Sequence, residues 1–214
     1  MLSVFFDQPA IFLAWVLAFL VALSFHEFCH ALAATLLGDS TPGRMGRLTL
    51  NPVAHIDMIG LLAVLFIGFG WGKPVQFNPY NLKWKKWGPT AVAFAGPLSN
   101  LFLGTLSAIG LMIAGPRLGC SNLLTGFLFL SLNINIALMV FNLFPLPPLD
   151  GSKALLASLS HPKYQSFRLF IEQKGQLILL GLILVDALFG LGIFARVISF
   201  ASGIFMYFFP AVCV

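Results

Sequence analysis

The sequence predicts an all-α membrane protein that crosses the bilayer several times, and three observations lead to that fold class. Hydrophobic residues make up 59% of the 214 residues, charged residues make up only 9%, and several apolar runs have the length of helical spans. A soluble domain carries about a quarter charged residues, so this chain cannot cover a water-facing surface. We expect a single membrane-embedded domain over residues 1–214, with about four to six membrane segments.

The long apolar runs cover residues 10–37, 89–114, 123–144 and 176–214. A helical span needs about 20 apolar residues, so each of the first three runs predicts one crossing. The last run predicts either two short helices broken near residues 190–192 or one crossing followed by an interfacial piece.

A fifth apolar run, residues 58–70, is only about a dozen residues long, which favours a re-entrant or interfacial segment. The flanking pieces 47–50 and 73–77 show strand-like alternation. Irregular backbone at membrane depth survives only where protein buries it or where it lines a wet cavity. We therefore expect a small membrane-level β-hairpin or sheet after the first span.

The basic residues indicate the topology. If residues 58–70 do not cross, ten lysines and arginines fall on one side of the membrane, and only Arg117 is clearly opposite. The positive-inside rule makes the basic side cytoplasmic. The net charge of +5 is therefore explained without nucleic acid as a partner.

The residues with the clearest chemistry lie within the first run, which contains His26-Glu27-Phe28-Cys29-His30. On a helix, positions i and i+4 share a face, so the two imidazoles can take adjacent corners of a tetrahedral zinc ion. Glu27 can then accept a proton from the attacking water, whose pKa the metal lowers toward neutrality. Ionisable groups within a span are costly and indicate a function, whereas a polar cluster that only joins helices does not need this spacing.

A zinc hydrolase needs a third protein ligand, and the chain offers only seven acidic residues. One of them, Asp150, follows the third run in the stretch Phe141-Asn-Leu-Phe-Pro-Leu-Pro-Pro-Leu-Asp-Gly151. Its prolines break the helix, so the chain can turn back and present Asp150 toward the bundle. Taken alone, the stretch is more typical of an ordinary proline-rich helix stop than of a metal-ligand loop. The other acidic candidates are Asp7, Asp39, Asp57, Glu172 and Asp186.

Taken together, these motifs resemble those of the site-2 protease family of intramembrane zinc metalloproteases. The HExxH motif in a span and the Asn-x-x-Pro-x-Pro-x-x-Asp-Gly stretch of residues 142–151 are the two defining motifs of that family. Residues 47–57, 72–75 and 95–100 also resemble its short, single-domain bacterial and archaeal members. The resemblance is strong over residues 20–155. Compared with many members of that family, we expect the chain to lack a span before the HExxH helix, inserted PDZ-type domains and appended CBS-type domains.

The resemblance implies a role for each motif residue. His26, His30 and Asp150 would hold Zn²⁺, Glu27 would be the catalytic base, and Asn142 would bind the substrate strand or stabilise the oxyanion. The implied activity is cleavage of a transmembrane segment of a membrane-protein substrate. The implied location is the cell (plasma) membrane, with the active site toward the cytoplasmic side.

The topology supports the same assignment. Asp150 can meet His26 and His30 only if the first and third long runs point the same way, which requires a single crossing between them. Residues 58–70 must then stay on one side, as the distribution of basic residues also requires.

Weaker predictions concern polar residues outside these motifs. His55 and Asp57 either orient a zinc ligand, as metal-bound imidazoles usually require, or form a turn hydrogen bond. Asn100 is most simply a packing element of the second long run, and Asn135 an interhelical hydrogen-bonding group.

The alternative function is a divalent-metal transporter or a metal-binding membrane subunit. It explains His and Asp inside the membrane, but not a Glu beside the first ligand. Transporters also tend to show internal repeats, and the sequence shows none. The expected partners are a transmembrane segment of a protein substrate and the lipid bilayer, and the sequence carries no signal of oligomeric state.

Overall fold

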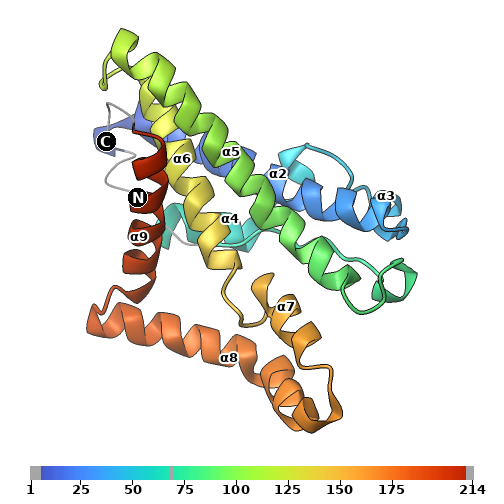
Figure 1. The fold of residues 1–214 in the computed structure, drawn as a ribbon. Coiled ribbons are helices and arrows are strands. Elements are labelled where there is room, and N and C mark those ends of the chain that lie inside the picture. The colour runs from blue at the N-terminus through green and yellow to red at the C-terminus, as the bar shows by residue number, and fades with distance from the viewer. Residues whose placement is uncertain (1–5, 68–69, 211–214) are drawn as a thin grey trace.

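The computed structural model describes residues 6–67 and 70–210, and three long helices form its centre (Figure 1). These helices are α2 (Pro9–Leu36), α5 (Gly88–Leu118) and α6 (Leu123–Asn142), and each is long and apolar enough to cross a membrane. They coincide with the first three predicted runs to within about four residues at either end. The chain is therefore a helical, multi-span membrane protein.

Small side chains allow these helices to approach one another closely. Within the membrane the hydrophobic effect does not drive helices together, so their contacts depend on close packing and polar groups. The buried small residues of α2 are Ala18, Ala22, Ser24, Ala31 and Ala34, and those of α5 include Ala93, Gly96, Ser99, Gly104 and Ala108. Larger apolar residues of α6, including Leu132 and Ile136, close the core against Ala108 and Leu111 of α5.

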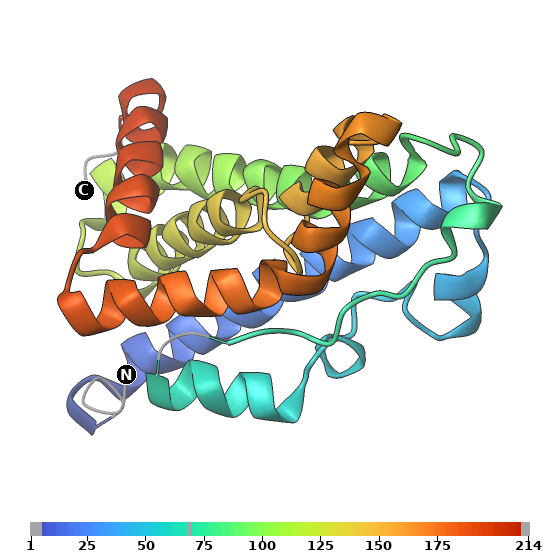
Figure 2. The same ribbon diagram turned by 90° about the horizontal axis from the view of Figure 1, so that it is seen from below.

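The connection between α2 and α5 begins with the short α3 (Thr41–Arg44) and η1 (Pro52–Ala54) and continues into α4 (Met58–Ile67). The ten residues of α4 extend only about 15 Å, so α4 is too short to cross a bilayer core of about 30 Å. After α4 the chain returns alongside α2, and η2 (Pro79–Asn81) precedes α5 (Figure 2). The sequence-based expectation that residues 58–70 do not form a full crossing agrees with this length.

The predicted membrane-level β-hairpin is wrong. Among the described residues there is no strand, and the one isolated antiparallel bridge in this region, between Ile56 and Gly72, lies outside both predicted pieces, 47–50 and 73–77. Pro52 starts a 3₁₀ turn just after the first piece, and Pro74 removes a donor from the second. The N–H of Val75, which a hairpin would use for its ladder, donates to the side chain of Glu27 instead.

One buried carboxylate joins the two ends of this connection. Asp39 is fully buried and accepts hydrogen bonds from the N–H (3.1 Å) and hydroxyl (2.7 Å) of Thr41, the N–H of Asn78 (2.6 Å) and the amide of Asn81 (2.9 Å). Burial alone would raise its pKa, but the four donors outweigh burial and lower the pKa to about 2. Asp39 therefore stays ionised and holds the segment around residue 80 against the end of α2.

Beyond α6 the chain forms α7 (Gly151–Ser158), η3 (Pro162–Tyr164), α8 (Gln165–Phe189) and α9 (Ile193–Phe208). Helices α8 and α9 meet at 93°, which is the break expected at residues 190–192. Gly190 and Gly192 have φ of +60° and +64°, a conformation in which a Cβ would be strained. Helix α9 lies beside α6 (Figure 1), and the ring of Phe194 packs at a tilt against those of Phe141 and Phe144.

Candidate metal centre

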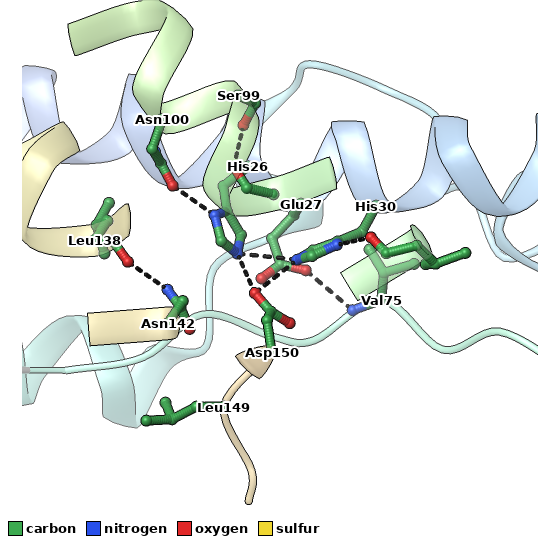
Figure 3. Close-up of polar contacts among 12 residues, drawn as sticks. His26, Glu27, His30, Val75, Ser99, Asn100, Leu138, Asn142, Leu149 and Asp150 are labelled. Carbon is green, nitrogen blue, oxygen red and sulfur yellow. Dashed lines mark hydrogen bonds and ion pairs between the residues drawn. The ribbon is translucent and has the colours of Figure 1, made fainter. Parts of the chain in front are cut away.

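Two imidazoles face each other on one side of α2. His26 and His30 are one helical turn apart, and their relative exposures are only 4% and 7%. The two Nε2 atoms are 3.0 Å apart, and the ring planes are nearly perpendicular, at 86°. The i, i+4 spacing of the motif therefore brings one nitrogen of each ring to the same point (Figure 3).

Asp150 reaches that point from the other end of the chain. Helix α6 ends at Asn142, and the proline-rich loop turns back so that Oδ2 of Asp150 lies 3.2 Å from the Nε2 atom of each histidine. Gly151 makes this turn possible, since a Cβ there would lie 2.2 Å from the carbonyl oxygen of Leu143. The loop is therefore more than a helix stop: it places a carboxylate against α2.

Hydrogen bonds on the far side of each ring determine which nitrogen carries the proton. Nδ1 of His26 lies 2.6 Å from Oδ1 of Asn100, and Nδ1 of His30 lies 2.8 Å from the carbonyl oxygen of Val92. Both oxygens can only accept, so both Nδ1 atoms donate. In neutral rings the two Nε2 atoms then carry lone pairs, and these point at each other and at Asp150.

Three electron-rich atoms thus converge without a proton between them. Oδ2 of Asp150 is buried and has no hydrogen-bond partner among the described residues. With both rings neutral, such an arrangement is repulsive unless a cation lies among the three atoms. The described residues contain this one group of three potential metal ligands, His26, His30 and Asp150.

Nε2 of His26, Nε2 of His30 and Oδ2 of Asp150 form a triangle whose size fits zinc. Its edges are 3.0, 3.2 and 3.2 Å. Tetrahedral zinc with ligands at 2.0–2.1 Å requires donor atoms about 3.3 Å apart, close to these edges. Two imidazoles and one carboxylate also leave a fourth position open, as catalytic zinc sites do.

Glu27 lies beside this triangle. At about 100° per residue, its side chain leaves α2 about 60° around the axis from that of His30. The carboxylate is 8% exposed, and its Oε2 accepts a hydrogen bond of 3.1 Å from the N–H of Val75. Figure 3 shows it on the same side of α2 as the two imidazoles, near Asp150.

Gly96 allows α5 to pass directly over the histidines. A Cβ at this position would lie 2.4 Å from Nε2 of His30 and 2.6 Å from Nε2 of His26, distances that real Cβ contacts do not show. Any larger residue would displace the imidazoles. Gly96 is therefore part of the site, although it contributes no functional group.

Asn142, at the last turn of α6, turns its amide toward its own helix (Figure 3). Its Nδ2 donates to the carbonyl oxygen of Leu138, 3.0 Å away on the same helix, and the side chain is half-buried. An amide nitrogen carries two protons, so one donor remains for a further partner.

One of the two sequence-based interpretations had His55 and Asp57 orient the histidines. The structure shows the other one, a local hydrogen bond for each residue. Nε2 of the fully buried His55 pairs with the carbonyl oxygen of Thr49, 2.8 Å away, and Asp57 accepts from the N–H of Gly60 at the start of α4. Both are local turn contacts. Asn100 and the carbonyl of Val92 take the ligand-orienting role that this interpretation had given to His55 and Asp57.

Sequence reasoning missed three contributions: the Asn100 side chain, the Val92 carbonyl and the Val75 N–H. A polar residue inside an apolar run, following Gly96-Pro97, was a usable signal for Asn100. No sequence signal marks which backbone groups of apolar residues will face a site.

Comparison with curated proteins finds relatives that share one description. The chain is 37% identical over 145 residues to "Putative zinc metalloprotease YwhC" of Bacillus subtilis, covering 65% of this chain and 66% of that protein. It is 33% identical over 184 residues to "Putative zinc metalloprotease Rip2" of Mycolicibacterium smegmatis, covering 83% of this chain and 69% of the relative. It is also 33% identical over 190 residues to "Putative zinc metalloprotease Rip2" of Mycobacterium tuberculosis H37Rv, covering 84% of this chain and 70% of that protein.

The matched part of this chain thus spans about two thirds of the length of these relatives. No protein-family model matches the chain, and no solved structure matches it significantly.

Proposed function

This chain belongs to the site-2 protease family of zinc metalloproteases, and from that premise we propose that it is an intramembrane zinc endopeptidase. Its substrate would be a transmembrane segment of another membrane protein. The observation that carries the proposal is the convergence of three lone-pair donors beside Glu27 within a membrane-spanning helix.

In this proposal His26, His30 and Asp150 are the zinc ligands. Bound zinc would supply a Lewis acid that lowers the pKa of water and polarises a peptide carbonyl. Glu27 takes the proton of the attacking water and passes it to the leaving amine. The N–H of Val75 keeps the Glu27 carboxylate oriented for that transfer. Asn142 uses its second amide proton on the substrate carbonyl as negative charge develops there.

The depth of the site supports a substrate within the membrane. His30 and His26 lie six and ten residues before Leu36, the end of α2, or about 9 and 15 Å along the helix. The 28 residues of α2 extend about 42 Å, about 12 Å more than a hydrocarbon core of about 30 Å. With this excess shared between its two ends, the histidines lie inside the core, toward the end of α2 that carries Leu36. A helical substrate must unwind there, because its carbonyls are otherwise hydrogen-bonded. The extended chain around Val75 runs beside Glu27 and offers a backbone along which an unwound strand could lie.

The orientation of the chain in the membrane is part of the same proposal. The loops that follow α2, precede α5 and follow α6 carry most of the lysines and arginines, and Asp150 lies at the end of α6 on that side. The positive-inside rule makes this side cytoplasmic in the plasma membrane. Water would then reach the site from the cytoplasm.

The test compares the wild-type protein with Glu27→Gln, His26→Ala and the control Glu172→Gln, which changes an exposed acid paired with Arg168. Elemental analysis should find near-stoichiometric zinc in every protein except His26→Ala. Mass spectrometry of membranes from expressing cells should find new peptide ends inside transmembrane segments with the wild type and Glu172→Gln only. Unchanged zinc in His26→Ala, or the same new ends with Glu27→Gln, would refute the proposal.

The rival function is a divalent-metal transporter. In proteoliposomes that contain a zinc indicator, a transporter would move zinc inward and Glu27→Gln need not stop it. A protease would cleave a transmembrane substrate found by the mass-spectrometry experiment, and it would do so without zinc flux. The position of the Glu27 side chain beside the two histidines and Asp150 favours the protease (Figure 3).

A further inference from the structure

Within the proposed zinc site, we propose that Asn100, held by Asn135, is a positioning residue that keeps the Nε2 lone pair of His26 directed at the metal position. Both asparagines are fully buried, and they come from different helices, α5 and α6. The two residues link α6 through α5 to a ligand on α2.

Each end of the Asn100 amide has a partner. Its Oδ1 lies 2.6 Å from Nδ1 of His26, and its Nδ2 donates to Oδ1 of Asn135 at 2.9 Å and to the carbonyl oxygen of Ala22 at 3.3 Å. Both ends of this amide are therefore engaged in the interior of the bundle, where an unpaired polar atom is costly.

The polarity of this chain of hydrogen bonds is determined at its far end. Nδ2 of Asn135 donates to the carbonyl oxygen of Ser131, 2.8 Å away, so Oδ1 of Asn135 must face Asn100. That oxygen requires a donor, which only Nδ2 of Asn100 can supply. Oδ1 of Asn100 is then left to face His26, where it can only accept. The proton of His26 is consequently on Nδ1, and the lone pair is on Nε2.

Reversing the Asn100 amide would break its contacts to Asn135 and Ala22 and would require the other tautomer of His26. Its oxygen would face Oδ1 of Asn135 and the carbonyl of Ala22, and its NH₂ group would face Nδ1 of His26. Two oxygens 2.9 Å apart without a proton repel each other. The network therefore selects one amide orientation and, through it, one histidine tautomer.

Both ligand histidines carry their proton on Nδ1, but the groups that accept a hydrogen bond from it differ. His30 donates to a backbone carbonyl, that of Val92, which no substitution removes. His26 donates to a side chain, so its tautomer depends on Asn100. Interhelical packing alone does not require this arrangement, because Ser107 of α5 already donates to Ser131 of α6 at 2.9 Å without contacting a histidine.

The experiment measures zinc affinity by chelator competition and the melting temperature of the zinc-free protein, both on the full chain in detergent. The variants are Asn100→Ala, Asn100→Asp and Asn135→Ala. Ser107→Ala is the matched control, since it removes a hydrogen bond between the same two helices.

Loss of a hydrogen bond that orients a metal ligand typically costs 10–100-fold in affinity. We expect Asn100→Ala to weaken zinc binding by about that factor, and Asn135→Ala by a smaller factor, because its loss frees the amide to reverse. Asn100→Asp keeps an acceptor for His26 although it loses both donor contacts. It should therefore bind zinc near the wild-type level, and at least about tenfold more tightly than Asn100→Ala. Ser107→Ala should lower the melting temperature and leave the zinc affinity unchanged.

A purely structural role would give a different pattern. Asn100→Ala and Ser107→Ala would then lower the melting temperature alike, and neither would change zinc affinity, which would overturn the proposal. If Asn100→Ala does not fold, weak zinc binding by Asn100→Asp would overturn it instead, because that variant retains the acceptor. A wild-type protein that binds no zinc would refute the proposed function itself, so the two failures are distinguishable.

Discussion

The carboxylate of Glu27 and the backbone N–H of Val75 are joined by a hydrogen bond of 3.1 Å, although 48 residues separate them in the sequence. The bond connects the proposed catalytic base on α2 to the extended chain that returns after α4. It gives a base in a membrane-spanning helix a defined orientation without a second charged side chain.

Replacement of Val75 by proline should lower turnover while leaving zinc content unchanged. The substitution removes the N–H, and a hydrogen bond to a charged group contributes about 1.5–3 kcal/mol, so we expect a rate loss of about 10–100-fold. Val75→Ala keeps the N–H and is the control. Cleavage of the identified substrate in proteoliposomes provides the measurement, and equal rates for the two variants would contradict an orienting role for this N–H.

Replacement of Gly96 by alanine should impair the site far more than the same change at Gly104 on the same helix. The new Cβ at Gly96 would lie 2.4 Å from Nε2 of His30, whereas the nearest atom at Gly104 is 3.6 Å away, an ordinary contact. Misplacing a reacting group by about 1 Å can cost about 10²-fold in rate. Zinc content and cleavage rate should both fall in Gly96→Ala only, and a fully active Gly96→Ala would show that α5 does not pack on the histidines in this way.

Replacement of Asn142 by aspartate should leave zinc content unchanged and lower turnover by about 10²–10³-fold, the usual cost of losing a donor to an oxyanion. Aspartate retains the size of the side chain but not the amide protons. Steady-state kinetics would separate the two roles expected from the sequence. A change in KM alone would place Asn142 in substrate binding, and no change would remove it from the site.

Stability should fall at acid pH through Asp39. Its pKa is lowered from 3.8 to about 2 on folding, so the carboxylate contributes stability that is fully present above pH 4 and is lost as the pH falls toward 2. In Asp39→Asn this fall should be absent, and at neutral pH the variant should be less stable by about 2–3 kcal/mol, because the four donors lose their charged partner. Melting temperatures between pH 2 and pH 7 give the comparison; parallel curves for the two proteins would rule out this role.

The topology can be tested with single cysteines in a background without the native ones. Cysteines at Lys85 and Lys163 should react with an impermeant reagent only from the cytoplasmic face, and one at Arg117 only from the opposite face. Labelling of the Lys85 position from outside would mean that the segment containing α4 crosses the membrane, which is incompatible with Asp150 meeting the histidines.

By itself, the sequence determined the spans, the HExxH helix and the ligand candidates, because these follow from patterns local to one segment. A run of about 20 apolar residues must cross the bilayer, and the i, i+4 spacing of His26 and His30 places both rings on one face of any helix. The topology argument also brought Asp150 to the right end of its helix. The predicted hairpin failed because strand-like alternation cannot reveal that Val75 donates to Glu27 rather than to a neighbouring strand.

Only the tertiary structure decided which groups surround the ligands. The partners of His26 and His30 are Asn100 and the carbonyl of Val92, both on α5, and sequence distance gives no measure of such contacts between helices. His55 and Asp57 looked equally suitable as residue types but turned toward local backbone groups. The physical reason is that helix packing, set by small residues such as Gly96, determines which polar atoms come within hydrogen-bonding distance.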